Sequence, residues 1–359
     1  MKLTDSQKDV IRKIIKDLEI HKFVTLGGYA GTGKTTCIKT IFDALSQKGL
    51  KFECCAYTGK AANVLSRKGI PASTIHSIIY RRSNREEKRF LELDWTLKSS
   101  NEIGNLDGFI IDEASMVSKE IHNDLLSYEL PILYVGDHGQ LEPIGDKFNL
   151  MAEPMHRLEE IHRNAGEIAH FAHHLRCGNS STSFQSGDKV QVVKSFAIED
   201  KHLAMVDQII CAFNKTRVSI NECVRRYKNL EYTSIAIGEK IICLRNHKKI
   251  GIFNGMQGIV TEICNLDKFN FISNGIQFID IEYNVNQWGK EKNEFDFDQR
   301  EIPFDYAYAI TAHKAQGDEF NSLIVMEQVC SKWDHRKWAY TAASRAKDHL
   351  IWATSNYNF

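Results

Sequence analysis

The feature that most constrains this chain is the glycine-rich segment Gly28–Thr35, which reads GYAGTGKT. It follows the apolar run Phe23–Leu26, typical of a buried strand, and precedes Thr36–Phe42, typical of the start of a helix. This is the G-x-x-x-x-G-K-[ST] pattern in the strand–loop–helix context that it requires. The glycines let the backbone turn its N–H groups inward, and the positive end of the helix dipole adds to the attraction for phosphate. The segment therefore predicts a nucleoside triphosphate site.

Two side chains at the end of this segment carry specific chemistry. The Lys34 ammonium would reach the β- and γ-phosphates, and the Thr35 hydroxyl would ligate Mg²⁺. The residues that we expect to contact the nucleotide here are Gly28, Ala30, Gly31, Thr32, Gly33, Lys34, Thr35 and Thr36.

Two adjacent carboxylates end another apolar run. Gly108–Asp112 is typical of a buried strand, and Glu113 follows it directly. At the end of a strand across from a P-loop, Asp112 is placed to hold Mg²⁺ through water. Glu113 is then placed to orient and deprotonate the attacking water. Gln140, in the loop that follows the run Ile132–Asp137, is a candidate sensor of the γ-phosphate.

The order of apolar runs predicts the architecture. Strands that alternate with helical connections repeat through the first half, which favours a parallel sheet with its ligand at the carboxyl edge. Pro154–Glu160 is expected to be a connector, and a second α/β unit follows with a strand at Gln208–Phe213. From Gly238 to about Gln299, short alternating runs between Gly- and Asn-rich turns indicate a small inserted antiparallel barrel. The α/β pattern resumes at Tyr306–Thr311.

Two local patterns leave alternatives open. Thr4 and Gln7 have the spacing of a helix capping box, and a glutamine just upstream of a P-loop can equally read the edge of adenine. His170, His173 and His174 share a helical face and could suit a metal. No acidic or cysteine ligand accompanies them, so a solvated helix face is the favoured interpretation.

The charged segment Arg81–Arg89 also has two interpretations. Such a run is most often a solvated surface. Phe90 and Trp95 follow it closely, and basic residues beside aromatic ones suit a surface that meets nucleic acid.

Composition excludes several classes of protein. Lysine plus arginine and aspartate plus glutamate both number 46, so a bulk polyelectrolyte binder of nucleic acid is not expected, although a local basic channel is compatible. The nine cysteines form no C-x-x-C pair, which favours a reducing cytosol over a disulfide framework or a zinc site. No apolar run reaches the length of a membrane span, and the first residues lack a signal-peptide core. We therefore expect a cytoplasmic protein, in the host cell cytoplasm if it is phage-encoded.

Taken in order, these motifs form more than a generic P-loop ATPase. The chain resembles superfamily-one helicases of the RecD-like group, and most closely the phage Dda helicases. The segments that carry the resemblance are Gly28–Thr35, Ala56–Ala62, Ile111–Met116, Gly136–Gly145, Thr311–Gly317 and Tyr340–Lys347.

The resemblance implies an α/β fold of two RecA-like P-loop domains with ATP between them. The first would span residues 1–160, with a small wedge insert at about 79–106, and the second residues 161–237 and 300–359. The insert at 238–299 would be an SH3-like β-barrel. Phe90 would be the first candidate for the residue that splits the duplex, and Trp95 the second, although either could equally be a core residue.

The resemblance also implies roles for individual residues. Gln7 would contact adenine, and Gly317 and Glu319 would contact the nucleotide. The residues expected at the γ-phosphate are Gln140, Arg163 and Arg345, the two arginines being supplied by the second domain. The residues expected to contact single-stranded DNA are Thr58, Lys60, Thr74, His76, Phe90, Asn254, Thr311, His313 and Lys314.

The function implied is an ATP- and Mg²⁺-dependent DNA helicase that moves 5′ to 3′ on a single strand and unwinds duplexes. The alternatives are an RNA or RNA–DNA helicase of the same superfamily, or an ATP-driven translocase or remodelling module without unwinding. The expected partners are single-stranded DNA and its junctions with duplex DNA, with a single-strand-binding or replication protein as a further candidate. We expect a monomer. Replication, recombination and repair all remain open as pathways.

Overall fold

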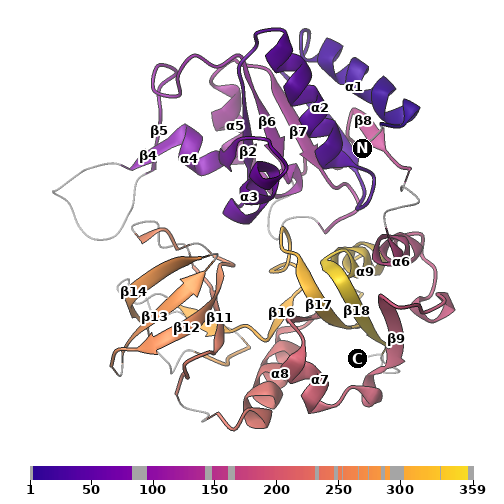
Figure 1. The fold of residues 1–359 in the computed structure, drawn as a ribbon, viewed down its shortest axis with the longest axis vertical. Coiled ribbons are helices and arrows are strands. Elements are labelled where there is room, and N and C mark those ends of the chain that lie inside the picture. The colour runs from indigo at the N-terminus through magenta and orange to yellow at the C-terminus, as the bar shows by residue number, and fades with distance from the viewer. Residues whose placement is uncertain are drawn as a thin grey trace. The chain divides into compact units, whose positions relative to one another are not determined.

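The computed structural model describes residues 3–82, 95–141, 148–160, 166–230, 234–245, 250–252, 254–265, 267–273, 275–283, 288–291, 303–331 and 333–354. These residues form two compact units, and the chain passes from the first to the second between Cys177 and Gly178 (Figure 1). In the described ranges, no helix combines the length and the apolar character that a membrane crossing requires.

The first unit is built on a six-stranded sheet in the order β3-β2-β6-β7-β1-β8, in which every neighbouring pair is parallel. Its strands are β1 (Phe23–Gly28), β2 (Phe52–Ala56), β3 (Ala72–Thr74), β6 (Gly108–Asp112), β7 (Ile132–Gly136) and β8 (His156–Leu158). Its helices are α1 (Asp5–Asp17), α2 (Lys34–Gln47), α3 (Gly59–Arg67), α4 (Ile75–Ile79), α5 (Lys119–Leu126) and α6 (Glu167–Arg176).

Apolar side chains project from both faces of this sheet, which explains the continuous hydrophobic runs of its strands. In β6, Ile110 joins a core cluster that contains Ile38 of α2, whereas Phe109 and Ile111 join the cluster on the other face with Ile121 of α5. The two clusters bury the sheet on both sides and leave its strand ends to carry polar residues.

The segment Pro154–Glu160, expected to be a connector, contains β8, so that prediction was wrong. β8 pairs in parallel with β1 through Leu26, Gly27 and Gly28, and Leu158 is buried against the first core cluster. A three-residue edge strand gives too short an alternation to recognise in the sequence, because its register is set by its neighbour.

A two-stranded antiparallel ribbon also belongs to this unit, and its residues Tyr80 and Leu97 pack against the second core cluster. Its strands are β4 (Tyr80–Arg82) and β5 (Trp95–Leu97), with Tyr80 opposite Leu97 and Arg82 opposite Trp95. The ribbon lies in the segment assigned to the wedge insert, and that assignment stays a prediction.

The second unit contains a five-stranded parallel sheet in the order β16-β10-β17-β18-β9. Its strands are β9 (Val190–Lys194), β10 (Gln208–Cys211), β16 (Ala309–Thr311), β17 (Phe320–Met326) and β18 (Ala346–Thr354), and its helices are α7 (Asp200–Met205), α8 (Asn214–Tyr227) and α9 (His335–Ala343). Short 3₁₀ turns lie at Ser181–Ser183 and Ser195–Ala197 here, and at Ala114–Met116 in the first unit. Two parallel sheets with helical connections confirm the predicted α/β class.

An antiparallel sheet in the order β14-β13-β12-β11-β15 is inserted between β10 and β16. Its strands are β11 (Lys240–Cys243), β12 (Gln257–Ile263), β13 (Lys268–Ser273), β14 (Ile276–Glu282) and β15 (Phe304–Tyr306). An aromatic core that includes Phe269, Phe271, Trp288 and Phe304 fills one face of this sheet. Tyr306 belongs to this sheet, so the parallel sheet resumes only at Ala309. The SH3-like assignment and the domain boundaries stay predictions.

Helix α8 fixes both ends of this insertion through buried polar side chains. Arg217 pairs with Asp305 of β15, and Arg225 pairs with Glu239 just before β11. Between them, Asn221 donates to the carbonyl of Tyr306 over 3.0 Å. These residues lie four apart on the helix and therefore share one face.

Candidate functional site

The glycine-rich loop after β1 has the backbone that a phosphate cradle requires. Gly31 and Gly33 have φ angles of 81° and 84°, a region that side-chain-bearing residues rarely adopt. A Cβ at Gly28 would lie 2.7 Å from the Thr32 hydroxyl oxygen and 2.9 Å from Cγ of Lys34. The loop therefore needs glycine at these positions, and α2 begins directly after it at Lys34.

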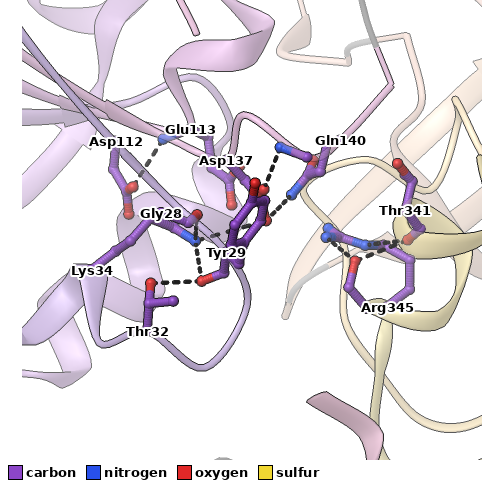
Figure 2. Close-up of polar contacts among 12 residues, drawn as sticks. Gly28, Tyr29, Thr32, Lys34, Asp112, Glu113, Asp137, Gln140, Thr341 and Arg345 are labelled. Carbon is purple, nitrogen blue, oxygen red and sulfur yellow. Dashed lines mark hydrogen bonds and ion pairs between the residues drawn. The ribbon is translucent and has the colours of Figure 1, made fainter. Parts of the chain in front are cut away.

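The Lys34 ammonium points back into this loop (Figure 2). Its Nζ donates to the carbonyls of Gly28 over 2.7 Å and Tyr29 over 3.1 Å. It lies 3.8 Å from Oδ2 of Asp137, a side chain that is almost fully buried. The lysine is thus the cation of a site whose nearest carboxylate comes from the end of β7.

The two predicted carboxylates lie at the end of β6, and only β7 separates that strand from β1 in the sheet. The Glu113 N–H donates to Oδ1 of Asp112 over 2.9 Å. Burial raises the pKa of Asp112, whereas this hydrogen bond and the Lys34 charge act in the opposite direction. Glu113 has a φ of 55°, which is unfavourable for a side-chain-bearing residue and turns the chain sharply out of the strand. Such strain is a common mark of functional positions.

Asp137 and Gln140 form a polar pair in the loop after β7. Asp137 accepts from the Gly139 N–H over 2.9 Å and from Nε2 of Gln140 over 3.3 Å. Both side chains are buried, and Oε1 of Gln140 has no hydrogen-bond partner among the described residues. An unpaired buried acceptor is costly and is suited to receive a donor from a ligand or from water.

Gln7 belongs to a capping box and also contacts the P-loop. Its backbone N–H donates to the Thr4 hydroxyl, and the Thr4 N–H donates to Oε1 of Gln7. Its Nε2 donates to the carbonyl of Thr32 over 3.0 Å. The capping interpretation is therefore confirmed, and an adenine contact stays a prediction.

His138 is a neighbour of the P-loop that the sequence did not single out. Its ring lies 4.1 Å from the ring of Tyr29, measured between centroids. Burial lowers the pKa of His138, and neither ring nitrogen has a hydrogen-bond partner in the described ranges. A Cβ at Gly27 would lie 2.7 Å from Nδ1 of this ring, so the glycine makes room for it.

Arg345 lies in the second unit, directly before β18. Only 5% of its surface is exposed. Its Nε donates to the Thr341 carbonyl over 3.1 Å, its NH1 to the Asp318 carbonyl over 3.3 Å and its NH2 to the Ser344 hydroxyl over 2.9 Å. The guanidinium is therefore held in one orientation.

Two other residues expected at the nucleotide lie in the turn before β17. Gly317 has a φ of 77°, and Glu319 is exposed.

Three predicted DNA contacts lie at the carboxyl edge of the first sheet. Thr58 is the N-cap of α3 and Thr74 the N-cap of α4, and both hydroxyls accept backbone N–H groups there. β2 and β3 are neighbours, with Ala56 opposite Thr74, so the structure brings these threonines to one edge. The ring of His76 packs beside the ring of Tyr80, with 5.5 Å between the ring centroids.

The structure describes some of the predicted residues only in part. Lys60 lies in α3 and Trp95 in β5, but their side chains are outside the described part. Phe90 and Arg163 lie outside the described residues altogether.

In the second unit, the loop after β16 carries the other predicted DNA contacts. Thr311 ends β16, and His313 and Lys314 follow it. The Lys314 ammonium donates to Oδ1 of Asn254, so two residues predicted separately are paired. Burial lowers the pKa of His313 and of Lys314.

The three histidines of α6 do not converge. His170 is exposed, and His173 contacts Arg176 over 3.2 Å. Within the described ranges, no three His, Cys, Asp or Glu side chains are grouped as a metal would need.

Two family models match the chain. One, described as an AAA domain, matches residues 2–196, and the other, described as the UvrD-like helicase C-terminal domain, matches residues 306–352. The chain belongs to the AAA-domain family that the first model describes, and the curated proteins that it is similar to include RecD-type and Pif1 DNA helicases.

Three relatives illustrate the breadth of this similarity. The ATP-dependent RecD2 DNA helicase of Deinococcus radiodurans is 25% identical, over 95% of this chain and 48% of its own length. The ATP-dependent DNA helicase Pif1 of Campylobacter jejuni is 24% identical, over 94% of this chain and 90% of its own length. The ATP-dependent DNA helicase dda of Enterobacteria phage T4 is 36% identical, but over only 40% of this chain and 33% of its own length. The expected closeness to Dda is thus supported only in part, and the chain spans about half the length of the RecD2 relative.

Solved structures share the fold along the whole chain. A Bacteroides Pif1 helicase in complex with ADP-AlF3 and single-stranded DNA matches with a TM-score of 0.58 and 20% identity, over 100% of this chain and 93% of its own length. A structure of two coordinating Pif1 helicases on forked duplex DNA matches with a TM-score of 0.57 and 19% identity, over 98% of this chain and 92% of its own length. These matches show the two-domain RecA-like fold.

Proposed function

We propose that this protein is an ATP- and Mg²⁺-dependent DNA helicase that moves 5′ to 3′ on a single strand and separates duplexes. The observation that carries the proposal is the convergence of Lys34, Asp112 and Asp137 at the carboxyl ends of β1, β6 and β7, in an AAA-domain chain that is similar to RecD-type helicases. Ligands of parallel sheets bind at such an edge.

Lys34 is proposed to bind the β- and γ-phosphates. Its present acceptors are the neutral carbonyls of Gly28 and Tyr29, and phosphate oxygens are stronger acceptors for an ammonium. The cradle of Gly28–Thr36 would supply N–H donors from the loop and from the start of α2.

Thr35 and Asp112 fit a magnesium ion. Both offer the hard oxygen ligands that Mg²⁺ takes, and the hydrogen bond from the Glu113 N–H holds the Asp112 carboxylate in place. When bound, the ion would neutralise phosphate charge beside the lysine.

Glu113 is proposed to orient the attacking water and accept its proton. The strained backbone at this residue supports the role, because such strain is a common mark of functional positions. The γ-phosphate is proposed to contact Gln140, Arg163 and Arg345. The fixed guanidinium of Arg345 suits this role, since stabilisation of developing charge requires a donor that is already oriented.

Single-stranded DNA is the proposed polymer substrate, contacted through the threonine, histidine, lysine and asparagine positions named above. Hydroxyl, amide and ammonium donors at strand ends suit a phosphate backbone. An RNA helicase, or a translocase without unwinding, is the alternative. We propose a cytoplasmic monomer whose partners are single-stranded DNA and its duplex junctions.

The test measures ATP hydrolysis by the purified chain in the presence of single-stranded DNA or of RNA with the same sequence. The two polymers are added at equal concentrations. We expect DNA to stimulate turnover more strongly. Lys34→Ala is the matched control, because it removes the phosphate cation and leaves the proposed DNA contacts unchanged. Stimulation by RNA alone would favour the RNA helicase, and no stimulation by either would overturn the proposal.

A further inference from the structure

Two side-chain hydrogen bonds join the inserted antiparallel sheet to the loop that follows β16. The Lys314 ammonium donates to Asn254, which lies just before β12. Nε2 of Gln257, the first residue of β12, donates to Oδ2 of Asp318 over 3.1 Å. The second bond connects residues 61 positions apart in the sequence, both of them in the second compact unit.

Asp318 contacts Arg345 through its main chain. Its carbonyl accepts from NH1 of Arg345 over 3.3 Å. Two residues later, the Phe320 N–H donates to the carbonyl of Arg345 over 2.9 Å. The short segment from Asp318 to Phe320 is therefore attached to Arg345 at two points, while its first side chain is attached to the inserted sheet.

The bond between Gln257 and Asp318 has a defined polarity. A carboxylate can only accept, so the amide nitrogen of Gln257 must face it. The opposite atom, Oε1 of Gln257, is buried and has no hydrogen-bond partner among the described residues. The glutamine is thus oriented by Asp318, and a change in charge or donor at either residue breaks the contact.

We propose that Gln257 and Asp318 are positioning residues that couple the inserted sheet to Arg345. A shift of β12 would be passed through the Gln257 amide to Asp318, and from the Asp318 carbonyl to the guanidinium. The inference rests on the proposed function, because that function assigns a γ-phosphate contact to Arg345 and a DNA contact to Asn254, just before the inserted sheet. It adds to that function the path by which DNA at the insert stimulates hydrolysis.

The experiment uses a swap of hydrogen-bond polarity in the full chain. Gln257→Glu places two carboxylates together and breaks the bond. Asp318→Asn, added to it, restores a bond in which the new amide donates to the new carboxylate. Gln277→Glu, at an exposed glutamine of β14, is the control for the charge change alone.

The readouts are kcat and KM for ATP with and without single-stranded DNA, and the thermal midpoint. We expect Gln257→Glu to lower the DNA-stimulated kcat on the order of fivefold, the scale of known coupling contacts, with DNA-free kcat and KM unchanged. The double variant should recover most of the loss, and Gln277→Glu should match the wild type.

Three results would overturn the inference. One is a Gln257→Glu variant with wild-type stimulation. The second is a double variant that fails to recover although its thermal midpoint equals that of the wild type, since the residues would then act separately. If the wild-type chain itself shows no stimulation by DNA, the proposed function fails and this inference fails with it.

Discussion

The Lys34 ammonium lies 3.8 Å from the buried carboxylate of Asp137, which also accepts the side-chain amide of Gln140. The P-loop and the loop after β7 therefore share one polar network, although Lys34 and Asp137 lie 103 positions apart in the sequence. Asp137 therefore contacts both Lys34, the proposed phosphate cation, and Gln140, the proposed sensor of the γ-phosphate. The first two predictions below test the nucleotide site to which this network belongs.

The first prediction concerns the chemical step. Lys34→Ala and Glu113→Gln should each lower DNA-stimulated ATP turnover at least about a hundredfold, the effect typical of electrostatic and acid–base groups. Steady-state hydrolysis at saturating DNA measures the effect, and circular dichroism checks that each variant is folded. Either variant within about twofold of wild type would contradict the assigned role.

The second prediction separates the capping role of Gln7 from its proposed contact with adenine. Thr4→Ala removes only the hydroxyl of the capping box and should destabilise the chain by about 1 kcal/mol with little change in nucleotide preference. Gln7→Ala removes the cap, the contact with the Thr32 carbonyl and the proposed contact with adenine, so it should also reduce the preference for ATP over GTP. The ratio of kcat/KM for the two nucleotides is the measurement. An unchanged ratio in Gln7→Ala would leave the residue with its capping role alone.

The third prediction concerns the buried ion pair at the entry to the inserted sheet. Arg225 and Glu239 are 3% and 1% exposed, and Arg225 also lies 3.9 Å from the ring centre of Tyr306. Arg225→Met should destabilise the second unit by about 3–5 kcal/mol, because it leaves a buried carboxylate without its cation. Adding Glu239→Gln removes that charge and should recover part of the loss. Urea unfolding followed by tryptophan fluorescence measures both, and a double variant less stable than the single one would contradict the explanation.

The fourth prediction is a loss of stability in mild acid. His122 is buried, its Nδ1 lies 2.9 Å from the Tyr134 hydroxyl, and burial lowers its pKa. The unfolded state then binds the proton more tightly, so this contribution to stability is complete above the unfolded pKa of about 6.5 and is lost as pH falls toward the folded value.

We therefore expect His122→Gln, which keeps a polar partner for Tyr134, to lose less stability than the wild type between about pH 7.5 and pH 5.5. Urea unfolding at the two pH values is the measurement. Other histidines of lowered pKa contribute with the same sign, so the comparison is between the two proteins. Equal losses would contradict the assignment to His122.

Local patterns predicted the parts of this site that depend on neighbouring residues. The P-loop between Phe23–Gly28 and Lys34–Gln47, and the acids at the end of Gly108–Asp112, follow from periodicity and motif spacing. The strand order then brings them to one edge, as parallel sheets require.

Other features depend on contacts between distant segments and could not be predicted in this way. The pairing of β8 with β1, the bond between Gln257 and Asp318 and the contact of His138 with Tyr29 have no signature in local sequence. Asp137 could have been found, because it lies at the carboxyl end of a buried strand, as Asp112 does.

The measurement that tests the central claim most directly is ATP-driven strand separation on two matched duplexes, one with a 5′ single-stranded tail and one with a 3′ tail. We predict that the chain opens the 5′-tailed duplex and leaves the other intact, and that Lys34→Ala opens neither. Opening of the 3′-tailed duplex alone would keep a helicase and contradict the predicted direction. If the wild type opens neither while DNA still stimulates hydrolysis, the claim of unwinding is contradicted, and the chain acts as a translocase or remodelling module.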